Sequence, residues 1–280
     1  MPIDPPAIPA PSRFEPSFIT QQDLEDLASY TGMSPEECLA RVRSYSLEEL
    51  AQAWKTKGPT TPEEVVGFYR STDLYIWELM QWHASAARQP YWAALSFLLE
   101  NYPPEAGWRR VYDFGCGVGT DALFLASHGY DVTLVDVDGP TFRFAKHRFE
   151  RRNLSARFIA STSPLPAPDA EYDVAVCFDV FEHLPDPLAA ARQLVATVRE
   201  RGLLVQQGGF ADEGYHPCHL REGLSRYGGA RWHICLAGLG LRRVTGLVYS
   251  KATGFEYVVQ RLRYSLWRVT GLWLSTVAML

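Results

Sequence analysis

Two hydrophobic patterns follow one another along the 280 residues of the chain. From about residue 18 to 103, apolar positions recur at helical spacing. From about residue 108 to 262, short β-branched runs alternate with helical stretches, which is typical of parallel strands joined by helices. The pattern predicts an α/β protein whose sheet carries helices on both faces, preceded by an all-helical N-terminal cap.

The cap has explicit helix-start signals. Residues 34–37 (SPEE) combine an N-cap serine, a proline at the first helical position and a capping-box glutamate. Residues 46–49 and 61–64 repeat the capping pattern. A longer helical stretch over 71–100 is expected to break or kink near Pro90.

Residues 111–121 (VYDFGCGVGTD) predict a buried strand that turns through three alternate glycines into a helix. Glycines at 115, 117 and 119 permit positive φ and close approach of a ligand to the backbone, and the following helix offers free N–H groups. A dinucleotide-binding turn requires a glycine where Thr120 stands. The NAD pattern therefore fails by one residue.

Four further segments with recognisable patterns follow in order along the chain. The strand of residues 131–139 carries Asp136 about twenty residues after the glycine turn, where a carboxylate accepts ribose hydroxyls. A third strand and loop begin at Arg157 and include Ser161. Residues 171–187 (EYDVAVCFDVFEHLPDP) read as a loop, a central strand and a Glu-His pair, and residues 202–210 read as a fifth strand.

Together these segments resemble the class I S-adenosylmethionine (SAM)-dependent methyltransferases over roughly residues 108–262. The resemblance implies SAM as cofactor, S-adenosylhomocysteine (SAH) as product and a Rossmann-like sheet of seven strands, mainly parallel. It implies that Asp136 binds the ribose, and that Ser161 stands where the family usually has an aspartate for the adenine. The full set of implied cofactor-binding residues is Asp113, Gly115, Cys116, Gly117, Gly119, Asp136, Val137, Ser161, Phe178 and Asp179.

The first five strands are expected near residues 111, 132, 157, 173 and 203, and a hairpin over 241–250 and 256–262 supplies the last two. An insertion over 209–240 contains a glycine hinge and a helix over 230–239. The predicted domains are a proline-rich flexible arm (1–17), the cap (18–103), the SAM-binding core (104–262) and an apolar tail (263–280).

Composition narrows the choice of partners. A net charge of −5 with scattered basic residues argues against nucleic acid, which requires a basic face. Five isolated cysteines show no disulfide or zinc spacing, which fits a reducing cytoplasm. The N-terminus has neither the basic start nor the apolar stretch of a signal peptide.

Three histidines are candidate general bases or orienting groups. His183 follows the fourth strand, with a structural role in holding the loop as its alternative. His216 and His219 follow the fifth strand, where such folds admit substrate. A metal site using Cys218 with these two histidines is the minor alternative, and because a fourth ligand is missing from the pattern, no metal is expected.

The cap contains many aromatic residues, most of which are expected in its core. Tyr69, Tyr75 and His83 have polar tips and are candidate substrate contacts, because a helical cap over the cofactor would shape an acceptor pocket. The apolar tail is interpreted as a terminal helix packed on the body or on a second copy of the chain, with contact to a membrane surface as the alternative.

The sequence thus predicts a SAM-dependent methyltransferase acting on an oxygen or nitrogen of a small molecule, with carbon left open. Two alternatives remain: a protein or peptide methyltransferase, and a SAM-binding, non-catalytic partner of another enzyme. A homodimer is also left open.

Overall fold

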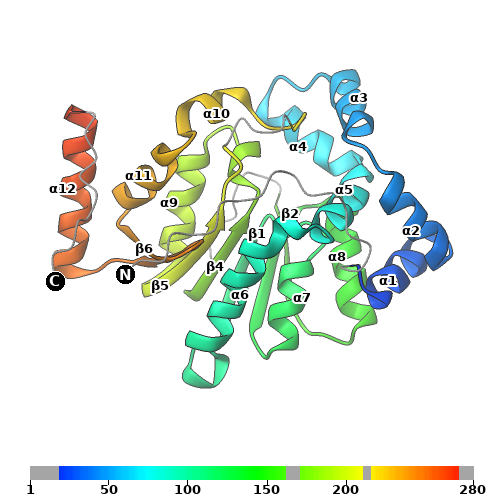
Figure 1. Ribbon diagram of the computed structural model, residues 1–280, viewed down its shortest axis with the longest axis horizontal. Helices are drawn as coiled ribbons and strands as arrows, with labels where there is room; N and C mark the ends of the chain where they lie inside the picture. Colours follow the sequence, from blue (N-terminus) through cyan, green and yellow to red (C-terminus); the bar gives the residue numbers. More distant parts are fainter. Residues whose placement is uncertain (1–18, 162–170, 211–215, 271–280) are drawn as a thin grey trace. The chain divides into compact units, whose positions relative to one another are not determined.

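The computed structural model describes residues 19–161, 171–210 and 216–270 (Figure 1). Their strands form a seven-stranded, mostly parallel sheet in the order β3-β2-β1-β4-β5-β7-β6, which confirms the predicted fold class. Internal contacts divide the chain into two compact units, residues 1–166 with 214–218 and residues 167–213 with 219–280. Each unit is described separately below.

The first unit contains three strands: β1 (Arg110–Phe114), β2 (Asp131–Val137) and β3 (Arg157–Ser161). β1 pairs with β2 and β2 with β3, both in parallel. Their connections are the helices α7 (Thr120–Ser127) and α8 (Pro140–Arg151), which give the predicted βαβ alternation. Val111, Leu134 and Val135 are fully buried, as expected for strands covered on both faces.

The helical cap belongs to the same unit as these strands. Its elements are α1 (Gln21–Thr31), α2 (Pro35–Ser44), α3 (Leu47–Lys57), α4 (Pro62–Ser71), α5 (Leu74–His83), α6 (Gln89–Asn101) and the 3₁₀ turns η2 (Ala86–Arg88) and η3 (Pro104–Ala106). The capping boxes predicted at Ser34 and Thr61 are both formed. Ser46 caps α3 through the N–H of Glu48, while the predicted capping-box residue Glu49 pairs with Arg41 instead, at 2.6 Å.

The predicted break near Pro90 is confirmed, and it lies just before the proline. α5 ends at His83, and Pro90 stands in the first turn of α6. A proline there interrupts nothing, because the first N–H groups of a helix have no partner within the helix. The chain bends just before this helix, at Ala84 and Ser85, and Ser85 caps η2.

A buried ion network joins the cap to α8. Arg148, 1% exposed, lies 2.6 Å from Asp23 and 3.3 Å from Asp26 of α1. Its guanidinium also donates to the carbonyl oxygen of Val118, at 2.7 Å, just before α7. Arg152 pairs with the same two aspartates. The cap is therefore attached to the base of the glycine turn by charge-assisted hydrogen bonds as well as by apolar contacts.

The second unit contains β4 (Tyr172–Phe178), β5 (Val198–Gln207), β6 (Leu241–Thr245) and β7 (Val248–Lys251). β4 and β5 are parallel, while β7 pairs antiparallel with both β5 and β6. Its helices are η4 (Phe181–His183), α9 (Pro187–Thr197), α10 (Arg221–Tyr227), α11 (Ala230–Gly238) and α12 (Gly254–Thr270).

The prediction of a strand over 256–262 is wrong. The last two strands lie closer together, at 241–245 and 248–251, and residues 256–262 belong to α12, which packs beside α11 (Figure 1). Tyr264 lies against Gly238 and Tyr257 against Gly240, where a Cβ would come within 2.5 Å of either ring. Packing of aromatic rings on these two glycines thus overrides the local β preference of the sequence.

The predicted arm at 1–17 and most of the apolar tail fall outside the described residues. Among the helices of the described part, none is both long and apolar enough to cross a membrane. None of the five cysteines forms a disulfide, and all five are buried.

Candidate functional site

The glycine turn between β1 and α7 has the backbone that the sequence predicted. Gly115, Gly117 and Gly119 have φ values of 70°, 54° and 73°, a region that side chains with a Cβ rarely occupy. The N–H groups of Gly115 and Cys116 both donate to the carbonyl oxygen of Val135 on β2, at 2.8 and 3.3 Å. These bonds hold the turn against the end of the neighbouring strand. α7 starts at its end without a side-chain cap.

Asp136 stands near the carboxyl end of β2 and reaches into this turn. Its carboxylate accepts hydrogen bonds from the N–H groups of Gly117 and Val137, both at 2.7 Å. Burial raises its pKa to about 6, and the two hydrogen bonds oppose that shift. In the β2–β3 register, Val137 lies opposite Ser161. Asp136, predicted for the ribose, and Ser161, predicted for the adenine, therefore lie at the same end of two paired strands.

Asp113, one of the implied cofactor-binding residues, is buried at the end of β1, just before the turn. Burial, together with the charges of Asp121 and Asp136, raises its pKa well above the usual value, while Arg88 opposes the shift. Arg88 itself pairs with Asp121 at 2.5 Å and lies over the ring of Tyr91, 4.2 Å from its centroid. Arg88 was not predicted from the sequence; its signal was that it is the single charged residue of the stretch 84–98.

The cap helices lie directly on the turn. A Cβ at Gly117 would come within 2.6 Å of Leu79 Cδ1 on α5, and one at Gly139 within 2.5 Å of the carbonyl oxygen of Tyr69 on α4. Gly117 therefore lets α5 approach the glycine turn, and Gly139, which precedes α8, lets α4 approach the end of β2. The contact of Leu79 with the glycine turn was not predicted, because in the sequence Leu79 has the helical spacing of an ordinary core residue.

Two of the three predicted substrate contacts lie together. The rings of Tyr69 and Tyr75 are 5.1 Å apart, with their hydroxyls at 3.5 Å, and Tyr75 is 6.2 Å from the ring of His216. His83 lines a different hollow, of about 510 Å³, with Met80, Trp92 and Phe124 among its neighbours. Neither tyrosine lines that hollow.

His216 is held by residues of the first unit. The N–H of Cys218 donates to its Nδ1 at 3.3 Å, so a neutral ring carries its proton on Nε2, which lies 3.9 Å from Glu78 Oε1. Accepting a proton at Nδ1 would break the bond to Cys218. Burial raises the pKa of the Cys218 thiol to about 12, and the thiol is hydrogen-bonded with Tyr75. This thiol stays protonated at neutral pH.

In the second unit, the end of β4 carries Phe178, which is buried, and Asp179, which adopts a positive φ of 54°. The N–H of Asp179 donates to Gln207 at the end of β5, at 2.9 Å. Glu182 follows, with 1% exposure, and accepts the N–H of Gly209 on Oε1 at 2.7 Å. Its Oε2 is buried and has no hydrogen-bond partner among the described residues.

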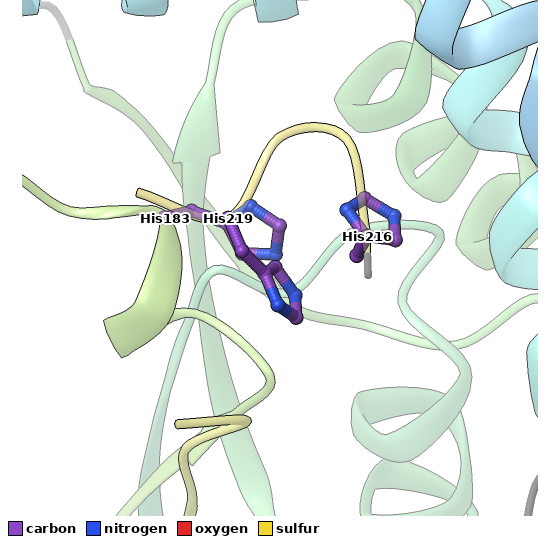
Figure 2. A group of neighbouring side chains, drawn as sticks. All are labelled: His183, His216 and His219. Atoms are coloured by element: carbon purple, nitrogen blue, oxygen red, sulfur yellow. The ribbon is translucent and has the colours of Figure 1, made fainter. Parts of the chain in front are cut away.

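The predicted bases His183 and His219 lie side by side in this unit, with ring centroids 4.8 Å apart at an interplanar angle of 77° (Figure 2). His219 Nε2 is 3.9 Å from Glu182 Oε1. Burial lowers the pKa of His219 to about 4, whereas burial and the charge of Asp179 raise the pKa of Glu182 to about 8. His219 is therefore neutral at neutral pH, as a proton acceptor must be, but its basicity is low.

Sequence comparison with known proteins points to methyltransferases. Residues 83–216 match a family model described as a methyltransferase domain. Ubiquinone biosynthesis O-methyltransferase of Coxiella burnetii is 31% identical over 97 residues, which cover 34% of this chain and 42% of that enzyme. The enzyme of the same name from Aliivibrio fischeri is 31% identical over 110 residues, covering 39% of this chain and 47% of its own length.

A probable S-adenosylmethionine-dependent methyltransferase of Mycobacterium tuberculosis is 34% identical over 126 residues, covering 42% of this chain and 45% of its own. The chain thus spans less than half the length of these relatives. Among solved structures, the N-methyltransferase NodS of Bradyrhizobium japonicum, in complex with SAH, aligns with a TM-score of 0.38 at 22% identity, over 43% of this chain and 60% of its own.

Proposed function

We propose that this chain is a class I SAM-dependent methyltransferase, which transfers the methyl group of SAM to an oxygen or nitrogen of a small molecule. The observation that supports this most strongly is the glycine turn with Asp136 at its mouth, in a segment that also matches the family. The product would be SAH.

We assign the cofactor to the residues that meet at the ends of β1, β2 and β3. Asp136 would accept the ribose hydroxyls, Ser161 would face the adenine with Val137, and the glycine backbone would lie against the methionine part. Asp113 would orient the turn from below. Cys116 would complete the cofactor contacts of this unit, and Phe178 and Asp179 are the cofactor residues that we propose in the second unit.

Methyl transfer is a displacement at carbon: the acceptor lone pair attacks the methyl, and the C–S electron pair returns to sulfur. The sulfonium supplies the driving force, so the protein has to align the acceptor about 3 Å from the methyl and exclude water. A base is required only when the acceptor carries a proton that must leave. His183, His216 and His219 are the candidate bases that would accept that proton. The N–H of Cys218 already occupies Nδ1 of His216, which makes His216 the least available acceptor of the three.

A small acceptor is favoured by the cap. Tyr69 and Tyr75 present neighbouring hydroxyls on α4, which lies against Gly139 at the end of β2, and on α5, which lies against Gly117 of the cofactor turn. This arrangement suits a compact acceptor with a polar group. The relatives named for ubiquinone biosynthesis are O-methyltransferases, which supports an oxygen acceptor. A protein or peptide acceptor, and a non-catalytic SAM-binding partner, are the remaining alternatives.

The test is methyl transfer from radiolabelled SAM to a panel of small hydroxyl and amine compounds, run beside unstructured peptides. We expect transfer to small acceptors that SAH inhibits and that Asp136→Asn abolishes. Transfer to peptides alone would replace the small-molecule proposal, and SAH binding without any transfer would favour the non-catalytic alternative.

A further inference from the structure

The hollow of about 510 Å³ beside His83 lies wholly within the first unit. Its lining comes from α1, α5, α6, α7 and α8 or from residues next to them, and it includes none of the residues assigned to the cofactor. Its volume is in the range of small-molecule sites, about 300–1,000 Å³. We propose that this hollow binds a small monocarboxylate with an apolar, ring-sized body, as a second ligand site beside that for SAM.

The hollow lies on the outer side of α7. Leu123, Phe124 and Ser127 line it, at the spacing of one helix face. Ala122 and Leu125, on the opposite face, are fully buried, and α7 packs on β2. A ligand in the hollow would therefore be distinct from the SAM and the acceptor, which meet at the ends of the strands.

One part of the wall is apolar and aromatic. The rings of Trp92 and Phe124 lie edge to face, with centroids 5.6 Å apart and an interplanar angle of 69°. Met80 and Leu123, each 3% exposed, add aliphatic surface. An apolar group is stabilised when it leaves water for such a surface, and a flat ring can also pack on the aromatic edges. The ligand should therefore have an apolar body.

Another part of the wall carries an excess of positive charge. Asp23, Arg148 and Arg152 are the charged residues of the lining, and the aspartate pairs with the two arginines at 2.6 and 2.7 Å. Asp26 pairs with both arginines as well, and also with Arg151. The described network thus has three guanidinium groups and two carboxylates. A carboxylate bound here would balance its charge.

Arg152 is the donor that such a carboxylate would meet. Arg148 is 1% exposed, and all three nitrogens of its guanidinium are already hydrogen-bonded. The side chain of Arg152 is 15% exposed. In the described part of the chain its hydrogen bonds use Nε and Nη2, so the two N–H groups of Nη1 are left for a ligand. A guanidinium and a carboxylate form strong, charge-assisted hydrogen bonds.

His83 limits the charge of the ligand. Burial, together with the charges of Arg88 and Arg148, lowers its pKa well below the usual value, so the ring is neutral. Its Nδ1 is buried and has no hydrogen-bond partner among the described residues. The imidazole therefore adds a polar group but no further cation. A single carboxylate fits this wall better than a phosphate or a dicarboxylate, whose second charge would lack a partner in the described lining.

The experiment titrates the full chain with 2-naphthoate, which combines one carboxylate with a flat apolar body. Calorimetry should give one 2-naphthoate per chain. 2-Naphthamide lacks the charge and acetate lacks the body, so each should bind at least tenfold more weakly. SAH should leave 2-naphthoate bound, because no cofactor residue lines the hollow. Displacement by SAH, equal binding of the amide, or absence of binding would overturn the proposal.

Two pairs of variants locate the ligand. Arg152→Met should weaken 2-naphthoate binding about tenfold, the loss expected for a hydrogen bond to a charged group. Arg143→Met, the same change at an α8 residue outside the hollow, should leave it unchanged. Circular dichroism checks that the variants fold.

The second pair leaves the ion network intact. Ser127 is exposed and lines the hollow. Ser127→Asp places a negative charge there, which should repel the carboxylate and weaken its binding, whereas the neutral Ser127→Asn should not. Equal affinities of the aspartate and asparagine variants, or of the folded Arg152→Met variant and the wild type, would show that 2-naphthoate binds elsewhere and would refute the site.

Discussion

The N–H of Gly117 donates to Oδ2 of Asp136 at 2.7 Å, although the two residues are 19 positions apart in the sequence. This bond joins the glycine turn to the acid that the family resemblance assigns to the ribose. One carboxylate therefore has two roles, because it fixes the conformation of the turn and also presents the oxygens that a cofactor would meet. Cofactor affinity should follow the charge of this carboxylate.

The pH dependence of binding follows from that charge. The pKa of Asp136 is raised to about 6 by burial, so its carboxylate becomes protonated below pH 6. A protonated acid accepts ribose hydroxyls poorly, and SAH affinity should fall roughly tenfold for each pH unit below this pKa. Calorimetric titrations from pH 8 to pH 5 test this, and an affinity that stays constant over the range would contradict it.

The same shift affects stability. The pKa in the folded chain lies above the ordinary value of 3.8, so the folded state binds this proton more tightly than the unfolded state. The resulting contribution to stability is fully present below about pH 4 and is lost as the pH rises through 6. Asp136→Asn should therefore reduce the slope of the unfolding free energy against pH between pH 4 and 6.

Gly117→Ala should impair the cofactor turn. Its φ of 54° disfavours a Cβ, at a cost of about 1–2 kcal/mol, and that Cβ would come within 2.6 Å of Leu79 Cδ1. We expect SAH affinity to fall at least tenfold. Adding Leu79→Ala should restore only the part lost to the steric overlap, since the backbone strain remains.

Gly67→Ala is the control for that substitution. Gly67 lies inside α4 with nothing within 4 Å of its Cβ position, so alanine there should leave SAH binding unchanged and raise the melting temperature slightly. Equal losses of SAH affinity in the Gly67 and Gly117 variants would refute this account of the turn.

Arg148 should carry much of the attachment of the cap. Arg148→Met leaves Asp23 and Asp26 short of a buried cation and should lower the free energy of unfolding by about 3–5 kcal/mol. Arg151→Met removes a partner of the same Asp26, but the Arg151 side chain is 36% exposed and its loss should cost under about 1 kcal/mol. Denaturant unfolding of both variants gives the comparison, and similar losses would show that burial does not decide the effect.

The elements that the sequence predicted well are those specified locally. The glycines at 115, 117 and 119 and the caps at Ser34 and Thr61 depend on residues within a few positions, and the structure has them as predicted. The five parallel-type strands also lie where their β-branched runs indicated.

The features that the sequence analysis missed depend on distant partners. Arg148 meets Asp26 across 122 residues, and Leu79 meets Gly117 across the packing of α5 on the turn. The segment 256–262 reads as a strand by composition, and only the rings seated on Gly238 and Gly240 show why it is helical. The approach of His219 to Glu182 likewise depends on the positions of two separate segments.

The most direct test of the central claim is a calorimetric titration of the full chain with SAH, with NADH as the competing cofactor and Asp136→Asn as the variant. We predict micromolar binding of SAH, no binding of NADH, and an affinity for SAH lowered roughly 100-fold in the variant, about 3 kcal/mol for hydrogen bonds to a charged group. Binding of NADH, or SAH binding that Asp136→Asn leaves unchanged, would contradict the assignment of this site to SAM.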